Sequence, residues 1–372
     1  MEKQISQFLH SLVVFREQLF RNPEPGWEEV TTTSAIERYL RSLSPELHIT
    51  RPLKTGLVAD AVFHQDAPFL ALRADIDALE INNTVRHACG HDVHTAIVAG
   101  VAILLYRMKI VPNFNLRFIF QPAEEPIPSG APQMIKAGVL NNVAAILGMH
   151  VDPNLPMRTL GLVDGWVNAQ SIRFDWTFIG PGGHSARPHQ VADPLRAATE
   201  MACRANRAAR KWETAEHPSV FTVTRLHAGD AYNAIPERAK LTATLRVTDQ
   251  QVRNEIIAEL DRIYTDVSEE TGSFARWDVQ MGSPPVYNDT RLTRQLHRIA
   301  HQHGWKVTEP KRSMGGDDFG WYVQQVPGVM VRLGIRKKKK MPALHSPEFR
   351  APMEAVEMGL RFFLQTIQHL TL

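Results

Sequence analysis

The chain has only two cysteines, Cys89 and Cys203, among its 372 residues. Two cysteines form at most one disulfide, so a small secreted scaffold held together by disulfides is excluded. No stretch reaches the roughly 18 consecutive apolar residues that a membrane-spanning helix needs, so we expect no membrane insertion. The opening stretch MEKQISQFLHSLVVFREQLF carries scattered charges and no cleavage site. We therefore expect no signal peptide and a cytoplasmic location.

A strong net charge is missing as well, since the formal charge is only +3. Proteins that bind nucleic acids usually carry a much larger basic excess. The basic run Arg336–Lys340 has no aromatic or further basic cluster around it. We interpret it as a solvated loop and expect no nucleic-acid partner. A Gly-x-Ser-x-Gly turn is also absent, which argues against a serine hydrolase.

What the sequence does contain is 44% hydrophobic residues in a chain too long for one ordinary domain. Up to about residue 168, apolar strands alternate with helical patterns, which is typical of an α/β domain with a mostly parallel sheet. Beyond that point, alternating strands and helices in the order strand, helix, strand, strand, helix, strand indicate an α+β domain with an antiparallel sheet. We predict one domain at 1–168 plus 284–372, interrupted by a second at 169–283.

Helical periodicity predicts several helices in the first domain. The chain should open with an amphipathic helix, and a second should begin near Thr31–Thr33, which offer N-caps. The segment Thr95–Met108 is apolar almost all round, as a buried helix would be.

The segment RHACGHDVHTA, from Arg86 to Ala96, concentrates metal-binding side chains ahead of that buried helix. Further candidates follow two later strands and lie in a late loop, so all should meet at one edge of the sheet. The candidate ligands are Cys89, His91, Glu125, His150 and His345.

Five ligands are too many for one tetrahedral zinc but suit two divalent ions that share a bridge. Thiolate and imidazole favour zinc, with manganese or cobalt as alternatives. Glu124 would then act as the general base toward a water molecule and return the proton to a leaving amine. This chemistry predicts hydrolysis of an amide. A non-catalytic protein that binds metal and an acylated ligand or a partner is the alternative, although such a protein has no need for Glu124.

Nine short motifs, in this order, resemble the di-metal aminoacylase family, which includes hippurate hydrolases, indoleacetyl-amino-acid hydrolases and, more remotely, carboxypeptidase G-type enzymes. The motifs are NPEPGWEE, RADIDAL, HACGHDVHTA, FQPAEE, GMH, GGHSARPH, AYNAIPE, MGGDDF and LHSPEF. The resemblance implies the same five metal ligands and the same base. It further implies hydrolysis of N-acyl or N-aroyl amino acids, with dipeptidase or carboxypeptidase activity as an alternative.

The resemblance also gives roles to residues outside the metal cluster. It implies that the inserted domain is a lid that forms a homodimer contact, and that His184 stabilises the oxyanion, often across subunits. Asn233 corresponds to a substrate contact, and Asp77 to a carboxylate that orients a ligand. Arg246 is a candidate for the substrate carboxylate, with an equally simple structural alternative. We assign neither His94 nor Cys203 as a ligand.

The chain departs from the family's pattern at Phe20, at Glu80, after the paired glutamates and in the stretch LHAGD that precedes the motif AYNAIPE. These positions belong to the pocket rim and the lid. We therefore expect them to affect substrate preference rather than catalysis.

Overall fold

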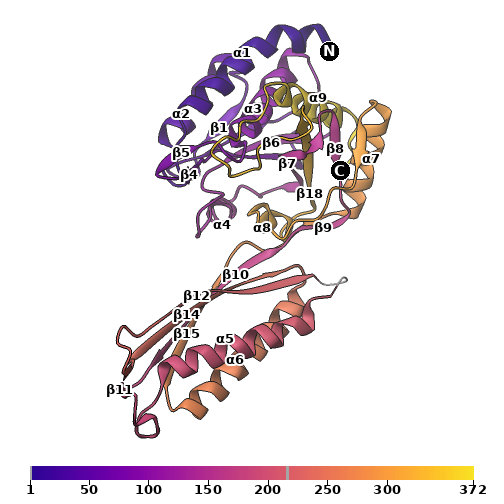
Figure 1. Ribbon diagram of the computed structural model, residues 1–372. Helices are drawn as coiled ribbons and strands as arrows, with labels where there is room; N and C mark the ends of the chain where they lie inside the picture. The colour runs from indigo at the N-terminus through magenta and orange to yellow at the C-terminus, as the bar shows by residue number, and fades with distance from the viewer. Residues whose placement is uncertain (1, 215–217) are drawn as a thin grey trace. The chain divides into compact units, whose positions relative to one another are not determined.

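The computed structural model describes residues 2–214 and 218–372, which form two compact units. Each unit is described by itself below (Figure 1). The first unit runs to Val167 and continues over Val286–Arg312 and Asp318–Leu372. The second comprises Asn168–Pro285 and Ser313–Asp317.

An eight-stranded sheet forms the centre of the first unit, in the order β1-β2-β6-β3-β7-β18-β8-β17. Its strands are β1 (His48–Thr50), β2 (Leu57–Ala61), β3 (Phe69–Asp75), β6 (Asn115–Gln121), β7 (Val143–Pro156), β8 (Thr159–Gly161), β17 (Lys306–Thr308) and β18 (Gly328–Arg336). The central neighbours β6, β3, β7 and β18 all run parallel, whereas β2 and β8 join them antiparallel. This arrangement confirms the predicted α/β class with a mostly parallel sheet.

Helices cover both faces of this sheet. They are α1 (Glu2–Arg21), α2 (Val30–Leu43), α3 (His91–Arg107), α4 (Gly130–Lys136), α7 (Thr290–Gln302), α8 (Phe319–Val323) and α9 (Glu354–His369). Along β3, Leu70 and Leu72 pack with α1, α2, α3, α7 and α9, while Ala71 packs with α4 and α8. Successive side chains of a strand point to opposite faces, so a strand covered on both sides is apolar throughout.

Helix α3 is the buried helix expected from its sequence, since every residue from His91 to Leu105 is buried. Helix α2 differs from expectation at its start. It begins at Val30, and no threonine caps it; the main-chain N–H groups of Thr31 and Thr32 donate instead to the carboxylate of Glu24, at 3.0 and 2.7 Å. A carboxylate at a helix N-terminus also interacts favourably with the helix dipole, so Glu24 stabilises the start of α2 in two ways.

The second unit is an antiparallel sheet in the order β12-β14-β10-β15 with two long helices on one face (Figure 1). Its elements are β10 (Gln170–Ile179), α5 (Pro194–Ala209), β12 (Ser219–Ala228), β14 (Arg238–Val247), α6 (Gln250–Thr271) and β15 (Phe274–Met281). Their order along the chain is the one expected for the inserted α+β domain. Alternate residues of β10 and β14 are buried against α5 and α6, as the sequence pattern predicts.

Short pairings complete the structure. In the first unit, β4 (Leu79–Ile81) pairs with β5 (Thr84–Arg86). Strand β9 (Gly165–Asn168), which ends at the first residue of the second unit, pairs with β16 (Val286–Asn288). In the second unit, β11 (Gly183–His184) pairs with β13 (Ala234–Ile235), and 3₁₀ turns occupy Pro188–Gln190 and Arg210–Trp212.

The basic run lies outside the core, as expected, because Lys337–Lys340 are all exposed. Among the described residues, none of the helices has the length and apolar character needed to cross a membrane.

Candidate metal centre

The register of the parallel strands brings chemically active residues to one edge of the first unit's sheet. Asp75 at the end of β3 lies opposite Gln121 at the end of β6, and Arg73 lies opposite Gly148 of β7. Strand β7 differs from expectation, since it does not end at His150 but continues to Pro156. It separates from β3 after Gly148 and stays paired with β18, so His150 still lies beyond the end of β3.

Gly90 allows Cys89 and His91 to face one point at the start of α3. Its φ is +92°, a left-handed value that favours glycine, and an added Cβ would lie only 2.5 Å from Cγ2 of Val151. The chain therefore turns sharply between the cysteine and the histidine, close against β7.

Five of the predicted donors converge here. Sγ of Cys89 lies 3.4 Å from Nε2 of His150 and 3.3 Å from Nε2 of His345. Oε1 of Glu125 lies 3.8 Å from the Nε2 atoms of both His91 and His345. The donors form two sets, Cys89–His91–His150 and Cys89–Glu125–His345, with ligand atoms within 4.8 Å of one another in each set. Cys89 belongs to both, which is the arrangement expected when two cations share one thiolate.

Two donor atoms in this cluster lack a hydrogen-bond partner among the described residues although they are buried: Nε2 of His91 and Oε1 of Glu125. A buried polar atom without a partner costs about 1–3 kcal/mol. A cation between them would satisfy both atoms. The chemistry of the site therefore fits divalent metal.

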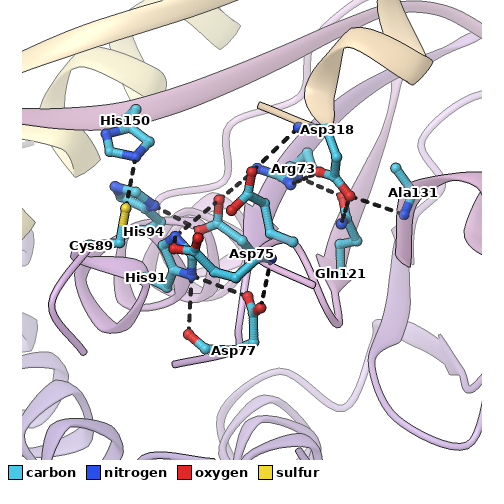
Figure 2. Close-up of polar contacts among 12 residues, drawn as sticks. Arg73, Asp75, Asp77, Cys89, His91, His94, Gln121, Ala131, His150 and Asp318 are labelled. Carbon is cyan, nitrogen blue, oxygen red and sulfur yellow. Dashed lines mark hydrogen bonds and ion pairs between the residues drawn. The ribbon is translucent and has the colours of Figure 1, made fainter. Parts of the chain in front are cut away.

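The other nitrogen of each buried ligand histidine is held by a hydrogen bond. Nδ1 of His91 donates to the main-chain oxygen and to Oδ1 of Asp77, at 3.0 and 3.1 Å, and Nδ1 of His150 donates to the carbonyl of Val151 at 2.8 Å. These bonds fix the tautomers that leave Nε2 available for a metal, and Figure 2 shows the contacts between His91 and Asp77. Asp77 also accepts from the main-chain N–H of Glu125 at 3.0 Å, so it orients two donors.

Burial changes the acid–base behaviour of these groups. It raises the pKa of the Cys89 thiol well above its usual range and raises the pKa of Glu125 to about 7. It also holds the pKa of His150 well below the usual value. For His91, burial alone would lower the pKa, but the neighbouring Asp75, Cys89 and Asp77 together outweigh it and raise the pKa well above its usual value. Thiolate and carboxylate are costly to keep charged here without a cation, which again fits a metal site.

Glu124 lies in the turn after β6 beside this cluster. Its ligand atoms, those of Glu125 and those of His91 lie within 4.8 Å of one another. The main-chain N–H of Asp318 donates to Oε1 of Glu124 at 3.3 Å. The turn itself is anchored by Ala123, which has a φ of +53° and donates its N–H to the buried Glu29 at 2.6 Å.

His94 is not oriented as a ligand. The main-chain N–H of Val151 donates to its Nε2 at 3.0 Å, so the proton is on Nδ1, which donates to Asp75 at 2.7 Å. With both nitrogens engaged, His94 ties Asp75 to the strand that carries His150. Cys203 is exposed on α5 of the second unit, away from any such cluster in the described chain.

The remaining predicted residues belong to the second unit. His184 and Asn233 are neighbours, since β11 pairs with β13 and the N–H of Ser185 donates to the carbonyl of Asn233 at 3.1 Å. Both line a cavity of about 820 Å³. The N–H of Ala186 donates to Nδ1 of His184 at 3.1 Å, which places the proton of a neutral imidazole on Nε2.

Arg246 does not line that cavity. It lies on β14, half buried, and makes no ion pair with any described residue. Burial lowers the pKa of its guanidinium. A half-buried arginine without a carboxylate partner suits an anionic ligand.

Two residues of the first unit's site, Arg73 and Asp318, are not among the residues predicted from the sequence. Arg73 bridges Asp75 and Asp318 at 2.6 Å to each, with all three side chains buried. A lone arginine within the apolar strand FLALRAD was the available signal, because charged residues are seldom fully buried unless paired. Asp318 lies in the motif MGGDDF, and its own pattern gave no chemical role.

The chain is similar to known proteins of one hydrolase family. Residues 71–369 match the family model described as peptidase family M20/M25/M40. An N-acetylcysteine deacetylase of Bacillus subtilis is 33% identical, covering 95% of each chain, and an N-acyl-L-amino acid amidohydrolase of Geobacillus stearothermophilus is 32% identical, covering 74% of this chain and 78% of that one. The solved structure of the Bacillus subtilis YXEP protein, a dinuclear metal-binding peptidase of family M20, superimposes with a TM-score of 0.83 at 31% identity, covering 98% of each chain.

Proposed function

This chain belongs to peptidase family M20/M25/M40, and we propose that it is a metal-dependent amidohydrolase that cleaves N-acyl amino acids into a carboxylic acid and a free amino acid. The observation that carries the proposal is the convergence of two three-donor sets on Cys89, with Glu124 beside them. The similarity to two relatives named for N-acyl amino acid hydrolysis supports the substrate class.

Two divalent cations would be held by the two donor sets. One would use Cys89, His91 and His150, and the other Cys89, Glu125 and His345. We propose zinc first, since thiolate and imidazole are its preferred donors, with manganese or cobalt as alternatives. When bound, such cations lower the pKa of a coordinated water and polarise the carbonyl oxygen of an amide.

Glu124 moves the proton. As a carboxylate next to the cluster, it would accept a proton from the attacking water and deliver it to the leaving nitrogen, which departs as an amine. The N–H of Asp318 orients this carboxylate by donating to Oε1. Asp77 holds the imidazole of His91 and the main chain of Glu125, so the donors keep their geometry while the proton moves.

The second unit would supply the substrate contacts. With its proton on Nε2, His184 can donate to the oxygen that becomes negative in the tetrahedral intermediate. Asn233 would contact the substrate amide, and Arg246 its carboxylate. We further propose that the protein is a cytoplasmic homodimer joined through the second unit and that His184 acts across the two subunits. The free state of both cysteines is compatible with a reducing compartment.

Peptidase activity is the second candidate function, because the similar solved structure is described as a peptidase. A dipeptide is itself an N-acyl amino acid whose acyl group carries an ammonium. The two functions therefore differ in the acyl portion that the pocket accepts.

The test is amine release from N-acetyl, N-benzoyl and indoleacetyl amino acids and from dipeptides, each with zinc, manganese and cobalt. We expect turnover of acylated amino acids that depends on metal and is lost in Glu124→Gln. Turnover of dipeptides alone would favour the peptidase. Metal-loaded, folded protein without any turnover would instead favour a binding protein.

Metal stoichiometry tests the ligands separately from activity. We expect about two ions per chain in the wild type and fewer in Cys89→Ala, since this residue belongs to both donor sets. The exposed Cys203→Ala is the matched control and should bind like the wild type. Unchanged metal content in Cys89→Ala would contradict the assignment.

A further inference from the structure

A buried ionic group connects the base to the metal-binding side chains. Arg73 of β3 donates from Nη1 to Oδ2 of Asp75 and from Nη2 to Oδ1 of Asp318, both at 2.6 Å (Figure 2). The side chains are 2% exposed for Arg73 and Asp75 and fully buried for Asp318. Nε of Arg73 also donates to Gln121 at 2.8 Å.

Both carboxylate oxygens of Asp318 accept hydrogen bonds. Its Oδ2 accepts from Nε2 of Gln121 at 2.7 Å and from the N–H of Ala131 at 3.2 Å. Its side chain is therefore tied to two strands, β3 and β6, and to the start of α4. Its own main-chain N–H is the group that donates to Glu124. The position of this N–H thus depends on the contacts that the Asp318 side chain makes.

Through Nη1, Arg73 also contacts Asp75, which lies beside the metal ligands. Oδ2 of Asp75 accepts from the guanidinium of Arg73, and Oδ1 accepts from Nδ1 of His94. Nε2 of His94 in turn accepts from the main-chain N–H of Val151, which follows His150 in the chain. One continuous series of contacts therefore runs from Glu124 to the donor strand β7.

A purely structural role is the alternative, and energetics argue against it. Removing three charges from water is expensive, and buried ion pairs are often no more stabilising than apolar residues of similar volume. A buried group of this kind is better explained by the geometry it enforces. At a catalytic centre a displacement of about 1 Å can lower the rate about 100-fold.

We propose that Arg73 and Asp318 are positioning residues that hold the carboxylate of Glu124 at a fixed position relative to the metal-binding side chains. The inference rests on the proposed function, because it assigns Glu124 the role of base. Arg73 spans two carboxylates with one planar guanidinium, which a lysine cannot do. The contact between Arg73 and the side chain of Asp318 fixes the position of the main-chain N–H of Asp318, which donates to Glu124.

The experiment compares Asp318→Asn, Arg73→Lys and Arg73→Met with a control pair in the same sheet. Arg117 of β6 binds Asp60 of β2 at 2.7 and 2.8 Å, part-buried like a structural ion pair and with no contact to the cluster in the described structure. Arg117→Lys, Arg117→Met and Asp60→Asn are the matched controls. Each protein is assayed for kcat, KM, metal stoichiometry and thermal unfolding.

We expect Asp318→Asn to lower kcat roughly 10- to 100-fold with KM and metal content within a factor of about two to three of wild type. Arg73→Lys should retain more kcat than Arg73→Met. The control variants should lose thermal stability without this loss of kcat. Variants of Arg73 and Asp318 that lose stability like the controls but keep wild-type kcat would overturn the proposal. Loss of metal without loss of kcat per metal-loaded site would overturn it as well.

A second readout does not depend on turnover. In crystals of the metal-loaded protein, the carboxylate of Glu124 should be displaced or disordered in Asp318→Asn and ordered in Asp60→Asn. If the wild type hydrolyses no amide, the proposed function fails while this comparison still decides the inference. A Glu124 carboxylate in the same place in all three proteins would contradict the positioning role.

Discussion

The two units bury very different material. In the second unit, the apolar side chains on the buried face of β10 are Ile172, Phe174, Trp176 and Phe178, and the rings of Phe174 and Trp176 stack with centroids 5.4 Å apart. Its ion pairs lie at the surface, as between Arg204 and Glu270. In the first unit, an apolar sheet ends in a buried cluster of charged groups that include Arg73, Asp75 and Asp77.

The difference separates stability from chemistry. An aromatic layer stabilises the fold by removing apolar area from water, at about 25 cal/mol per Å². Buried charges contribute little net stability, so the edge that carries them must be held by the surrounding sheet. We therefore expect changes at the metal centre to affect turnover more than folding, and changes in the second unit's core to do the reverse.

The largest effect should follow the loss of the base. Glu124→Gln keeps the shape but cannot accept a proton, so we expect kcat to fall by a factor of about 10² to 10⁴. Steady-state kinetics with metal analysis measures this, and metal content and thermal unfolding should match the wild type. An isosteric change at an exposed carboxylate of the second unit, Glu270→Gln, serves as the control. Substantial turnover in Glu124→Gln would contradict the expectation that changes at the metal centre affect turnover more than changes in the second unit do.

A change in the aromatic layer should have the opposite character. Trp176→Ala removes a fully buried ring, and we expect the free energy of unfolding to fall by about 3–5 kcal/mol. Urea unfolding followed by circular dichroism measures the loss. Phe274 is 68% exposed on β15 of the same sheet, and Phe274→Ala should change stability by less than about 0.5 kcal/mol. Equal losses in both variants would show that burial of this layer is not what stabilises the second unit.

A backbone substitution sharpens the comparison within the first unit. Gly90→Ala combines a left-handed φ with a Cβ placed 2.5 Å from Val151, so we expect a loss of about 1–3 kcal/mol and weaker metal binding. Gly304→Ala is the matched control, because Gly304 has a φ of +73° but no atom within 4 Å of an added Cβ. Thermal unfolding and metal titration separate the two. Normal metal binding in a folded Gly90→Ala protein would mean that this turn does not orient the donors.

The smallest effect concerns a surface ion pair of the second unit. Burial of Asp175 would raise its pKa, but the hydroxyl of Thr242 and the guanidinium of Arg173 outweigh it and lower the pKa below the ordinary 3.8. A lowered folded pKa stabilises the protein above the unfolded value and loses that contribution as the pH falls through the folded value. Asp175→Asn should therefore cost about 0.5 kcal/mol or less near neutral pH and nothing in strong acid. Unfolding measured from neutral pH to below pH 3 tests this, and an effect that grows in acid would reverse the assigned sign.

The fold class could be predicted because the distribution of apolar residues was clear in both units. The segment that forms α3 is apolar all round, as in a buried helix, whereas β10 and β14 alternate between apolar and polar residues, as in a sheet with one buried face. The ends of helices and strands were harder to predict from the sequence. Glu24, from the loop ahead of α2, caps that helix, and β7 passes His150 because β18 continues to pair with it. Both depend on a partner that is distant in the chain or lies outside the element itself.

The candidate site shows the same division. Cys89, His91 and the paired glutamates could be selected by residue type, since few other roles suit such side chains in one loop and at one strand end. Arg73 and Asp318 could not, because their importance lies in a contact between residues 245 positions apart. The tautomers of His94 and His184 are likewise set by main-chain N–H groups that no side-chain pattern reveals.

The insertion of the second unit between Val167 and Val286 has a consequence for the order of folding during synthesis. The second unit is almost continuous in sequence, so its elements can associate soon after they are made. The first unit must wait, because Ile146 of β7 pairs with Gly328 of β18 and Cys89 faces His345. Closing such a long loop is entropically costly and slows the formation of the contacts that depend on it. A ribosome-bound chain should therefore acquire a folded insert first, and the donor set that includes His345 only after the segment containing that residue has emerged.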